Sequence, residues 1–190
     1  MKTVALYGGS FDPPHVAHVL SVAWVLSALP VDAAWVLPVW RHRLGKTHAA
    51  PFAERMTLCR LAFSLFGDRV QVRDDEARPE ASGATIDLVR HLQLLHPDVQ
   101  FRLVIGSDIL HQRALWQQFE ELMSVAPLIV LPRPGFEVDP AFADASAPLL
   151  LPDVSSTWLR AALPVGANVA GLLPRPVAAH IAERGLYGRG

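Results

Sequence analysis

The sequence predicts an α/β fold in which a doubly wound, mostly parallel sheet carries helices on both faces. Short apolar runs of strand length, such as 3–7 and 101–105, alternate along the chain with longer segments of helical periodicity. Glycine, proline or charged residues follow directly on most of these runs, as expected where strands end. The length of 190 residues suits a single domain over 1–190, with a small helical C-terminal end.

The elements can be assigned in order along the chain. The run at 3–7 is typical of a buried parallel strand, and the helix after it, 16–29, is apolar nearly all round, so we expect it to pack on the sheet. The helix at 85–95 has an apolar side and begins at Thr85, a fair N-cap. The other predicted strands are 33–39, 70–73, 101–105, 127–131 and 149–151, and the other predicted helices are 51–66, 115–124, 156–162 and 175–184.

Composition and charge exclude several classes of protein. Apolar residues make up 51% of the chain and charged residues 18%, which excludes a disordered protein. A formal net charge of −1 lacks the electrostatic footprint of a nucleic-acid binder. The single cysteine, Cys59, cannot form an internal disulfide, which fits a reducing compartment. The apolar stretch at 19–29 is too short to span a bilayer, so we expect a cytoplasmic protein without a membrane partner. The sequence leaves the oligomeric state open, a homo-oligomer included.

A glycine-rich turn with two histidines follows the first predicted strand, and its sequence is Gly8-Gly9-Ser10-Phe11-Asp12-Pro13-Pro14-His15-Val16-Ala17-His18. The glycines let the backbone turn sharply and approach a ligand closely. His15 and His18 lie three residues apart on the first turn of the next helix, where unpaired N–H groups favour a phosphate. The alternatives are an ordinary helix surface or two zinc ligands, but no cluster supplies the further ligands that zinc requires. We therefore predict a phosphate site and no metal site.

Polar residues also follow other predicted strands. Arg41, Arg43 and Lys46 follow the second strand, the sequence Gly106-Ser107-Asp108 follows the fourth and Arg133 follows the fifth. In a parallel α/β sheet these strand ends meet at one edge, where a nucleotide would lie. The cations suit phosphate groups, and Asp108 either accepts from ribose hydroxyls or caps the next helix.

A second candidate phosphate element lies far downstream, with the sequence Val154-Ser155-Ser156-Thr157-Trp158-Leu159-Arg160. Ser155 or Ser156 can cap a helix whose first N–H groups point at an anion. Arg160 lies one turn further on and can reach phosphate oxygens over the same helix end. Trp116, between the two motifs, either belongs to the core or stacks on a flat heterocycle.

These motifs carry a family resemblance. The first resembles the signature of the nucleotidyltransferase superfamily with the HxGH motif, with Ala17 in place of the glycine, and the second resembles that superfamily's I/V-S-S-T-x-x-R motif. The segments 84–88, 104–108 and 131–135 resemble internal motifs of bacterial nicotinate-nucleotide adenylyltransferases, and the match covers essentially the entire chain. The resemblance implies a Rossmann-like fold. It also implies NAD biosynthesis by transfer of an adenylyl group from ATP to nicotinate mononucleotide, with release of deamido-NAD and pyrophosphate.

The residue types favour a direct, in-line transfer. The sequence contains no recognisable pattern of an activated serine or cysteine, which a covalent intermediate would require. Catalysis then rests on positioning and on stabilisation of phosphoryl charge. The candidate catalytic residues are His15, His18, Lys46 and Arg160. The candidate ATP contacts are Gly8, Gly9, Ser10, Phe11, His15, His18, Gly106, Asp108, Arg133, Ser155, Ser156, Thr157 and Arg160. The candidate nicotinate mononucleotide contacts are Gly9, Ser10, Lys46, Thr85 and Trp116.

By the same resemblance, Thr85 would present a backbone N–H to the nicotinate carboxylate and Trp116 would stack on the pyridine ring. Mg²⁺ is expected to arrive with ATP, held mainly by phosphates and water, because no cluster of carboxylates in the sequence indicates a magnesium site made by the protein itself. Two alternatives remain open. One is a sister transferase whose acceptor is nicotinamide mononucleotide or phosphopantetheine, and the other is a nucleotide-binding module without catalysis.

Overall fold

The structure, a computed structural model, describes residues 1–41, 47–78 and 80–188. Its five parallel strands form one sheet in the order β3-β2-β1-β4-β5. The strands are β1 (Lys2–Gly9), β2 (Ala33–Pro38), β3 (Val70–Val72), β4 (Val99–Gly106) and β5 (Leu128–Leu131). The α-helices are α1 (Val16–Ala28), α2 (Phe52–Phe63), α3 (Thr85–Leu95), α4 (Ser107–Leu110), α5 (Phe119–Val125), α6 (Ser156–Ala162) and α7 (Arg175–Arg184). Short 3₁₀ helices are η1 (Ser64–Arg69), η2 (Asp75–Ala77), η3 (Arg113–Leu115), η4 (Pro140–Ala145) and η5 (Leu163–Val165).

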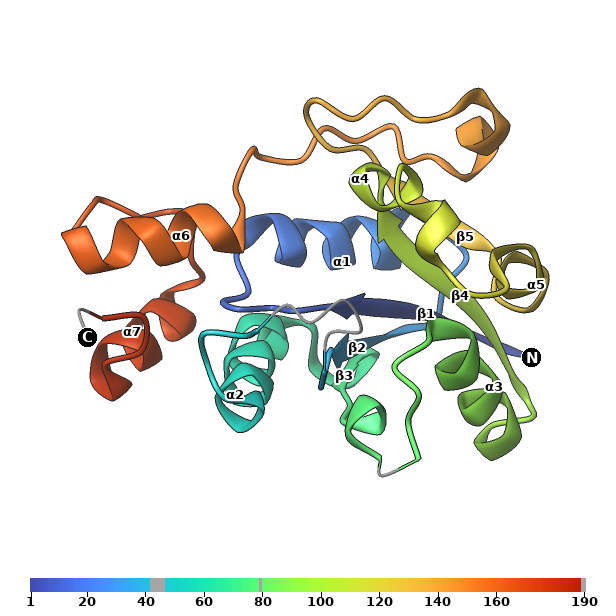
Figure 1. The fold of residues 1–190 in the computed structure, drawn as a ribbon, viewed down its shortest axis with the longest axis horizontal. Helices are drawn as coiled ribbons and strands as arrows, with labels where there is room; N and C mark the ends of the chain where they lie inside the picture. Colours follow the sequence, from blue (N-terminus) through green and yellow to red (C-terminus); the bar gives the residue numbers. More distant parts are fainter. Residues whose placement is uncertain (42–46, 79, 189–190) are drawn as a thin grey trace.

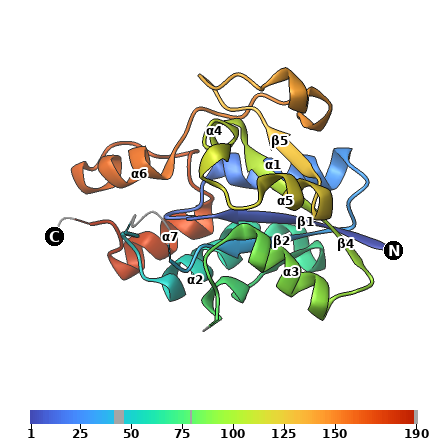
Figure 2. The same ribbon diagram turned by 45° about the vertical axis from the view of Figure 1, so that its right-hand side comes forward.

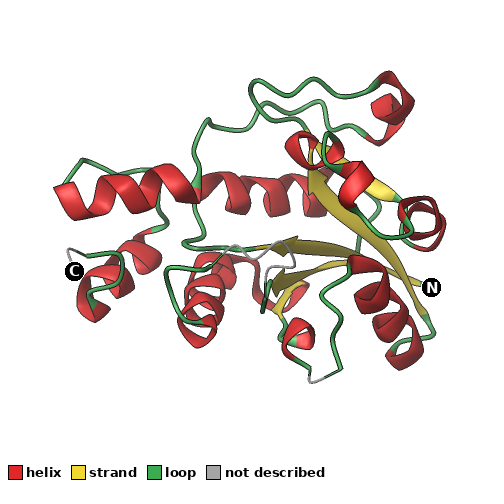
Figure 3. Ribbon diagram, viewed as in Figure 1, coloured by secondary structure: helices red, strands yellow, loops and turns green. Residues whose placement is uncertain are grey.

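Helices cover both faces of the sheet (Figures 1 and 3). Side chains of β1 alternate between the two faces, so that Ala5 lies in one buried apolar cluster and Leu6 in the other. Helices α1, α2 and α7 pack in the first cluster, and α3 and α5 pack in the second. The chain termini lie at opposite ends of the molecule, with α6 and α7 on the side of the C-terminus (Figures 1 and 2). The predicted doubly wound α/β fold with a helical C-terminal end is confirmed.

The predicted helices 85–95, 156–162 and 175–184 match the bounds of α3, α6 and α7. The predicted strand at 149–151 is wrong: β5 is bridged instead by Ser146, and Leu151 is buried in the core without joining the sheet. The predicted helix at 115–124 is also wrong in its first half, because Gln118 has a positive φ of 51° and α5 begins only after it.

Two local predictions at turns need correction. Thr85 is the first residue of α3 and not its N-cap, which is Ala84. Gly8 and Gly9 are still part of β1, and the sharp turn comes at Phe11, whose φ is 46°. A Cβ on Gly9 would lie 3.1 Å from the Phe11 ring, so a glycine is needed there because the buried phenylalanine folds back over it.

Arg55 on α2 joins the segments that follow β1 and β2. Its side chain is 1% exposed, and its guanidinium donates to the backbone carbonyls of Ser10 at 2.8 Å, Val39 at 2.8 Å and Ala50 at 3.3 Å. Ser10 follows β1 and Val39 follows β2, so one planar donor group fixes the carboxyl ends of two neighbouring strands.

Replacement of Arg55 should therefore destabilise the fold. We expect Arg55→Met to lower the free energy of unfolding by about 3 kcal/mol, because one buried and two partly buried carbonyls lose a charged donor. Arg60→Met, at an exposed position of the same helix, should change it by less than about 0.5 kcal/mol. Urea unfolding followed by circular dichroism measures both values, and equal effects at the two positions would contradict the assigned role.

Candidate active site

A cavity of about 610 Å³ opens at the carboxyl ends of the strands. The predicted site residues that line it are Gly8, Gly9, Ser10, Phe11, His15, His18, Thr85, Gly106, Asp108, Trp116, Arg133, Ser155, Ser156, Thr157 and Arg160. Arg41 lines it as well, whereas Arg43 and Lys46 lie outside the described residues. The topology thus brings segments far apart in sequence to one place, as expected for a parallel sheet.

The turn after β1 is organised by Asp12, whose side chain is buried. Its Oδ2 accepts from the N–H of Ala49 at 2.7 Å, and its Oδ1 accepts from the N–H of Ala50 at 3.1 Å and from the Tyr187 hydroxyl at 2.8 Å. The backbone carbonyl of Asp12 accepts from Arg160 at 2.6 Å. Asp12 therefore connects the first phosphate motif to the segment after β2, to α6 and to the end of the chain.

The second phosphate motif packs directly on the first. Ser155 is the N-cap of α6, where its hydroxyl accepts from the N–H of Trp158 at 3.1 Å. Ser156 donates from its hydroxyl to the backbone carbonyl of Pro13 at 2.8 Å. Since Pro13 precedes α1, the starts of α1 and α6 lie side by side at the cavity, and both ends carry partial positive charge.

His15 and His18 are stacked, with ring centroids 3.7 Å apart and planes inclined by 23°. The N–H of His15 donates to Nδ1 of His18 at 3.1 Å, so Nδ1 of His18 carries no proton and its Nε2–H is a donor. Burial, assisted by Arg133, lowers the pKa of His15 to about 3. Burial, together with His15 and Arg133, holds the pKa of His18 well below its usual value. Both rings are therefore neutral near pH 7, and each neutral ring keeps one N–H that can donate.

The ends of β4 and β5 are joined by Ser107, which is fully buried. Its hydroxyl accepts from the N–H of Arg133 at 2.9 Å and donates to the carbonyl of Phe136 at 3.0 Å. Asp108 lies beside it, with Oδ1 3.6 Å from Nε of Arg133. Within the described residues Oδ1 of Asp108 accepts no hydrogen bond, and the carboxylate does not cap α4. A Cβ on Gly106 would lie 2.2 Å from this oxygen, so the glycine leaves room for the carboxylate.

Thr85 and Trp116 form another part of the cavity wall. Thr85 begins α3, so its backbone N–H belongs to the first turn of a helix, where N–H groups lack intrahelical partners. Trp116 follows η3 and is half-buried, with its ring edge-on to Phe119. It packs against the cluster around α3 and α5 while lining the cavity, and its stacking on a flat heterocycle stays a prediction.

Sequence reasoning did not identify the structural roles of Asp12, Arg55, Ser107 and Tyr187. Asp12 and Tyr187 are 175 positions apart, and no spacing rule connects them. The available signal for Asp12 was a carboxylate inside an otherwise apolar and proline-rich turn, where it needs buried donors.

Among the described residues, no group of three or more histidine, cysteine or acidic side chains could hold a metal, and no helix is long and apolar enough to cross a membrane.

Residues 6–162 match the family model described as cytidylyltransferase-like. A probable nicotinate-nucleotide adenylyltransferase of Anaeromyxobacter dehalogenans (strain 2CP-1 / ATCC BAA-258) is 40% identical over 98% of this chain and 97% of its own. The chain belongs to the cytidylyltransferase-like family. A probable nicotinate-nucleotide adenylyltransferase of Myxococcus xanthus is 36% identical, over 97% and 94% of the two chains. The fold is similar to that of Plasmodium falciparum nicotinic acid mononucleotide adenylyltransferase complexed with NaAD, with a TM-score of 0.83 at 21% identity over 98% of each chain.

The family motif has an alanine at position 17 in this member. Ala17 is 3% exposed and lies in the cluster on the α1 face of the sheet. Its carbonyl accepts from the Ser21 hydroxyl at 2.7 Å in the next turn of α1. The extra methyl group of alanine is therefore accommodated in the buried cluster, and α1 keeps its regular first turn around His15 and His18.

The neutral histidines make the stability depend on pH. An unfolded chain binds a proton at the ordinary histidine pKa of 6.5, whereas folded His15 resists protonation down to about 3, so acid favours the unfolded state. We expect His15 alone to cost about 2 kcal/mol of unfolding free energy between pH 7 and pH 5. Urea unfolding at a series of pH values should show a shallower decline for His15→Gln. His91→Gln, outside the cavity, should retain the wild-type decline, and the same decline in His15→Gln would refute the assignment.

Proposed function

We propose that this protein transfers the adenylyl group of ATP to nicotinate mononucleotide, which yields deamido-NAD and pyrophosphate. The observation that carries the proposal is one cavity that joins two helix starts, a neutral histidine pair and the Asp108–Arg133 pair. The chain also aligns over almost its whole length with probable nicotinate-nucleotide adenylyltransferases. We further propose that residues 1–190 act as one domain in the cytoplasm, since a single sheet connects both buried clusters.

At the phosphate end, the acceptor phosphate oxygen would attack the α-phosphorus of ATP in line. One P–O bond forms, the bond to the β-phosphate breaks, and the pair of electrons leaves with pyrophosphate. His15 and His18 would donate hydrogen bonds to the phosphate oxygens as charge moves between them. Arg160 and Lys46 would hold the triphosphate, with Arg160 placed for this by its contact with the Asp12 carbonyl. The backbone would lie close to the triphosphate at Gly8, Gly9, Ser10 and Phe11.

The other parts of the cavity would hold the two nucleosides. Asp108, whose side chain lines the cavity and is 30% exposed, would bind the adenosine ribose next to Gly106 and Arg133. Thr85 would present its backbone N–H to the ring carboxylate of nicotinate, and Trp116 would stack on the ring. Mg²⁺ bound with ATP would neutralise the triphosphate charge. The absence of a ligand cluster among the described residues fits an ion that phosphates and water hold.

The reaction can be tested by pyrophosphate release from ATP and Mg²⁺ with nicotinate mononucleotide, nicotinamide mononucleotide or phosphopantetheine as acceptor. We expect the acid mononucleotide to be strongly preferred, because a backbone N–H favours a carboxylate over an amide. His18→Ala should lower kcat by at least about 100-fold while the protein stays folded. Preference for another acceptor would assign the chain to a sister reaction. Release with none would point to a nucleotide-binding module without catalysis.

The ribose assignment can be tested separately at Gly106. Gly106→Ala should raise the KM for ATP about tenfold, because the new Cβ displaces the Asp108 carboxylate and a charged hydrogen bond is lost. The KM for the mononucleotide should stay unchanged. Asp108→Ala should have a similar effect, and adding Gly106→Ala to it should change little further, since the clash has been removed. A wild-type KM for ATP in Gly106→Ala would argue against this role of Asp108.

A further inference from the structure

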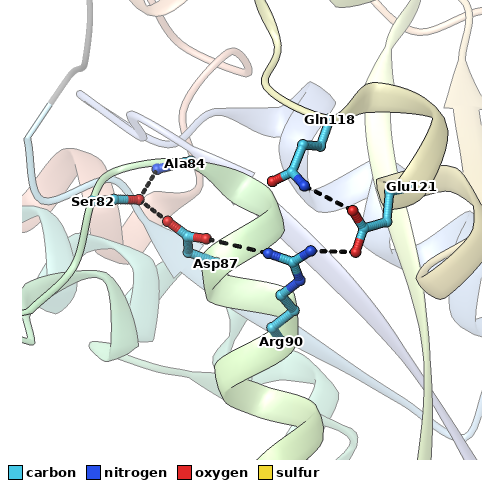
Figure 4. A network of polar contacts seen from close by, with 6 residues as sticks. All are labelled: Ser82, Ala84, Asp87, Arg90, Gln118 and Glu121. Carbon is cyan, nitrogen blue, oxygen red and sulfur yellow. Dashed lines mark hydrogen bonds and ion pairs between the residues drawn. The ribbon is translucent and has the colours of Figure 1, made fainter.

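A polar network joins the start of α3 to the start of α5 (Figure 4). On the α5 side, Arg90 of α3 forms an ion pair with Glu121, and Gln118 donates from Nε2 to the other oxygen of Glu121 at 2.8 Å. Gln118 adopts the left-handed conformation immediately before α5, so Glu121 contacts both the guanidinium of Arg90 and the N-cap residue of this helix.

The same network continues to the loop before α3. The Ser82 hydroxyl accepts from the N–H of Ala84 at 3.0 Å and donates to Asp87. Arg90 lies 4.0 Å from the second oxygen of Asp87. The Asp87 carboxylate thus contacts the Ser82 hydroxyl on one side and the Arg90 guanidinium on the other. Through Ser82, the loop before Thr85 is bonded to the helix that it leads into (Figure 4).

The network reaches the cavity only at Ala84, and its charged residues flank one end of the cavity without lining it. Thr85 and Trp116 both line the cavity, whereas Arg90, Asp87 and Glu121 are not among the described lining residues. Thr85 is two positions before Asp87, and Trp116 is two positions before Gln118. The walls assigned to the nicotinate ring therefore belong to the two segments that Arg90 connects.

The charge of Asp87 bears on what this end of the cavity can bind. Asp87 is the third residue of α3, and a carboxylate in the first turn occupies the region of positive potential that would otherwise favour a bound anion. Glu121 adds a second negative charge nearby. Arg90 offsets this charge at short range. Its side chain is 43% exposed, so the effect is moderate and sensitive to salt.

We propose that Arg90 is a positioning residue for the acceptor end of the cavity, and that by offsetting the charge of Asp87 it favours an acceptor whose ring bears a carboxylate over one whose ring bears an uncharged carboxamide. This inference rests on the proposed adenylyl transfer. Arg90 touches neither substrate in this assignment. It acts through Asp87 on the start of α3 and through Glu121 on the segment that carries Trp116.

The test is a double-mutant cycle with Arg90→Gln, Asp87→Asn and the double variant. The ratio of kcat/KM for nicotinate mononucleotide to that for nicotinamide mononucleotide is measured from pyrophosphate release at low and at high salt. We expect Arg90→Gln to lower this ratio by about three- to fivefold at low salt and by less at high salt, with the KM for ATP unchanged. Asp87→Asn in the Arg90→Gln background should restore the ratio.

The matched control is Arg184→Gln on α7. It removes an exposed arginine that pairs with Glu54 of α2, so it changes the charge equally and should leave the ratio unchanged. A ratio that Arg90→Gln does not alter would overturn the inference. So would a loss that Asp87→Asn does not restore, because Arg90 would then act through folding alone. Wild-type protein that uses neither acceptor would overturn the proposed function itself, and this outcome is distinct from an acid preference that is independent of Arg90.

Discussion

The buried carboxylate of Asp12 is the constraint on which the arrangement of the cavity depends. A charge that is 2% exposed is costly unless its oxygens are fully hydrogen-bonded, and here the donors are Ala49, Ala50 and Tyr187. None of these donors belongs to the turn itself. Because Arg160 also bonds the Asp12 carbonyl, the second phosphate motif is placed by the same residue. The turn after β1 is thus held by contacts that only the completed fold supplies.

In the cavity, the groups that carry positive charge are different from the two histidines that we propose contact the transferring phosphate. Within the described residues, the positive charge of the cavity comes from Arg41, Arg133, Arg160 and the helix starts, while His15 and His18 stay neutral because they are buried. Neutral rings do not repel the neighbouring Arg133, so the pair can stack closely in the free protein. A bound triphosphate would favour protonation of the rings, since negative charge nearby raises a histidine pKa.

The sequence predicted those features that depend on local chemistry or on topology. Apolar periodicity and end signals were sufficient for α3, α6 and α7, and the rule for parallel strand ends brought Gly106, Asp108 and Arg133 to the cavity. The false strand at 149–151 has strand composition, but whether a run pairs with a sheet depends on tertiary contacts. At Gln118 a positive φ precedes α5, a backbone conformation that the apolar pattern does not reveal, and the donors of Asp12 come from segments up to 175 residues away. Such contacts leave no periodic signal.

The two ends of the cavity are built in different ways. At the proposed phosphate end, Arg160 bonds the Asp12 carbonyl and Ser156 bonds the Pro13 carbonyl, across 148 and 143 positions of the chain. A change there is therefore expected to disturb the fold and the chemistry together. The proposed acceptor end is formed by the start of α3 and by the segment before α5 that carries Trp116, and exposed side chains such as Arg90 and Glu121 connect the two helices beside it. Exposed pairs can be exchanged at small cost in stability. A fold of this kind can thus retain one phosphate-transfer apparatus while substitutions at the rim of α3 and α5 alter the acceptor that it receives.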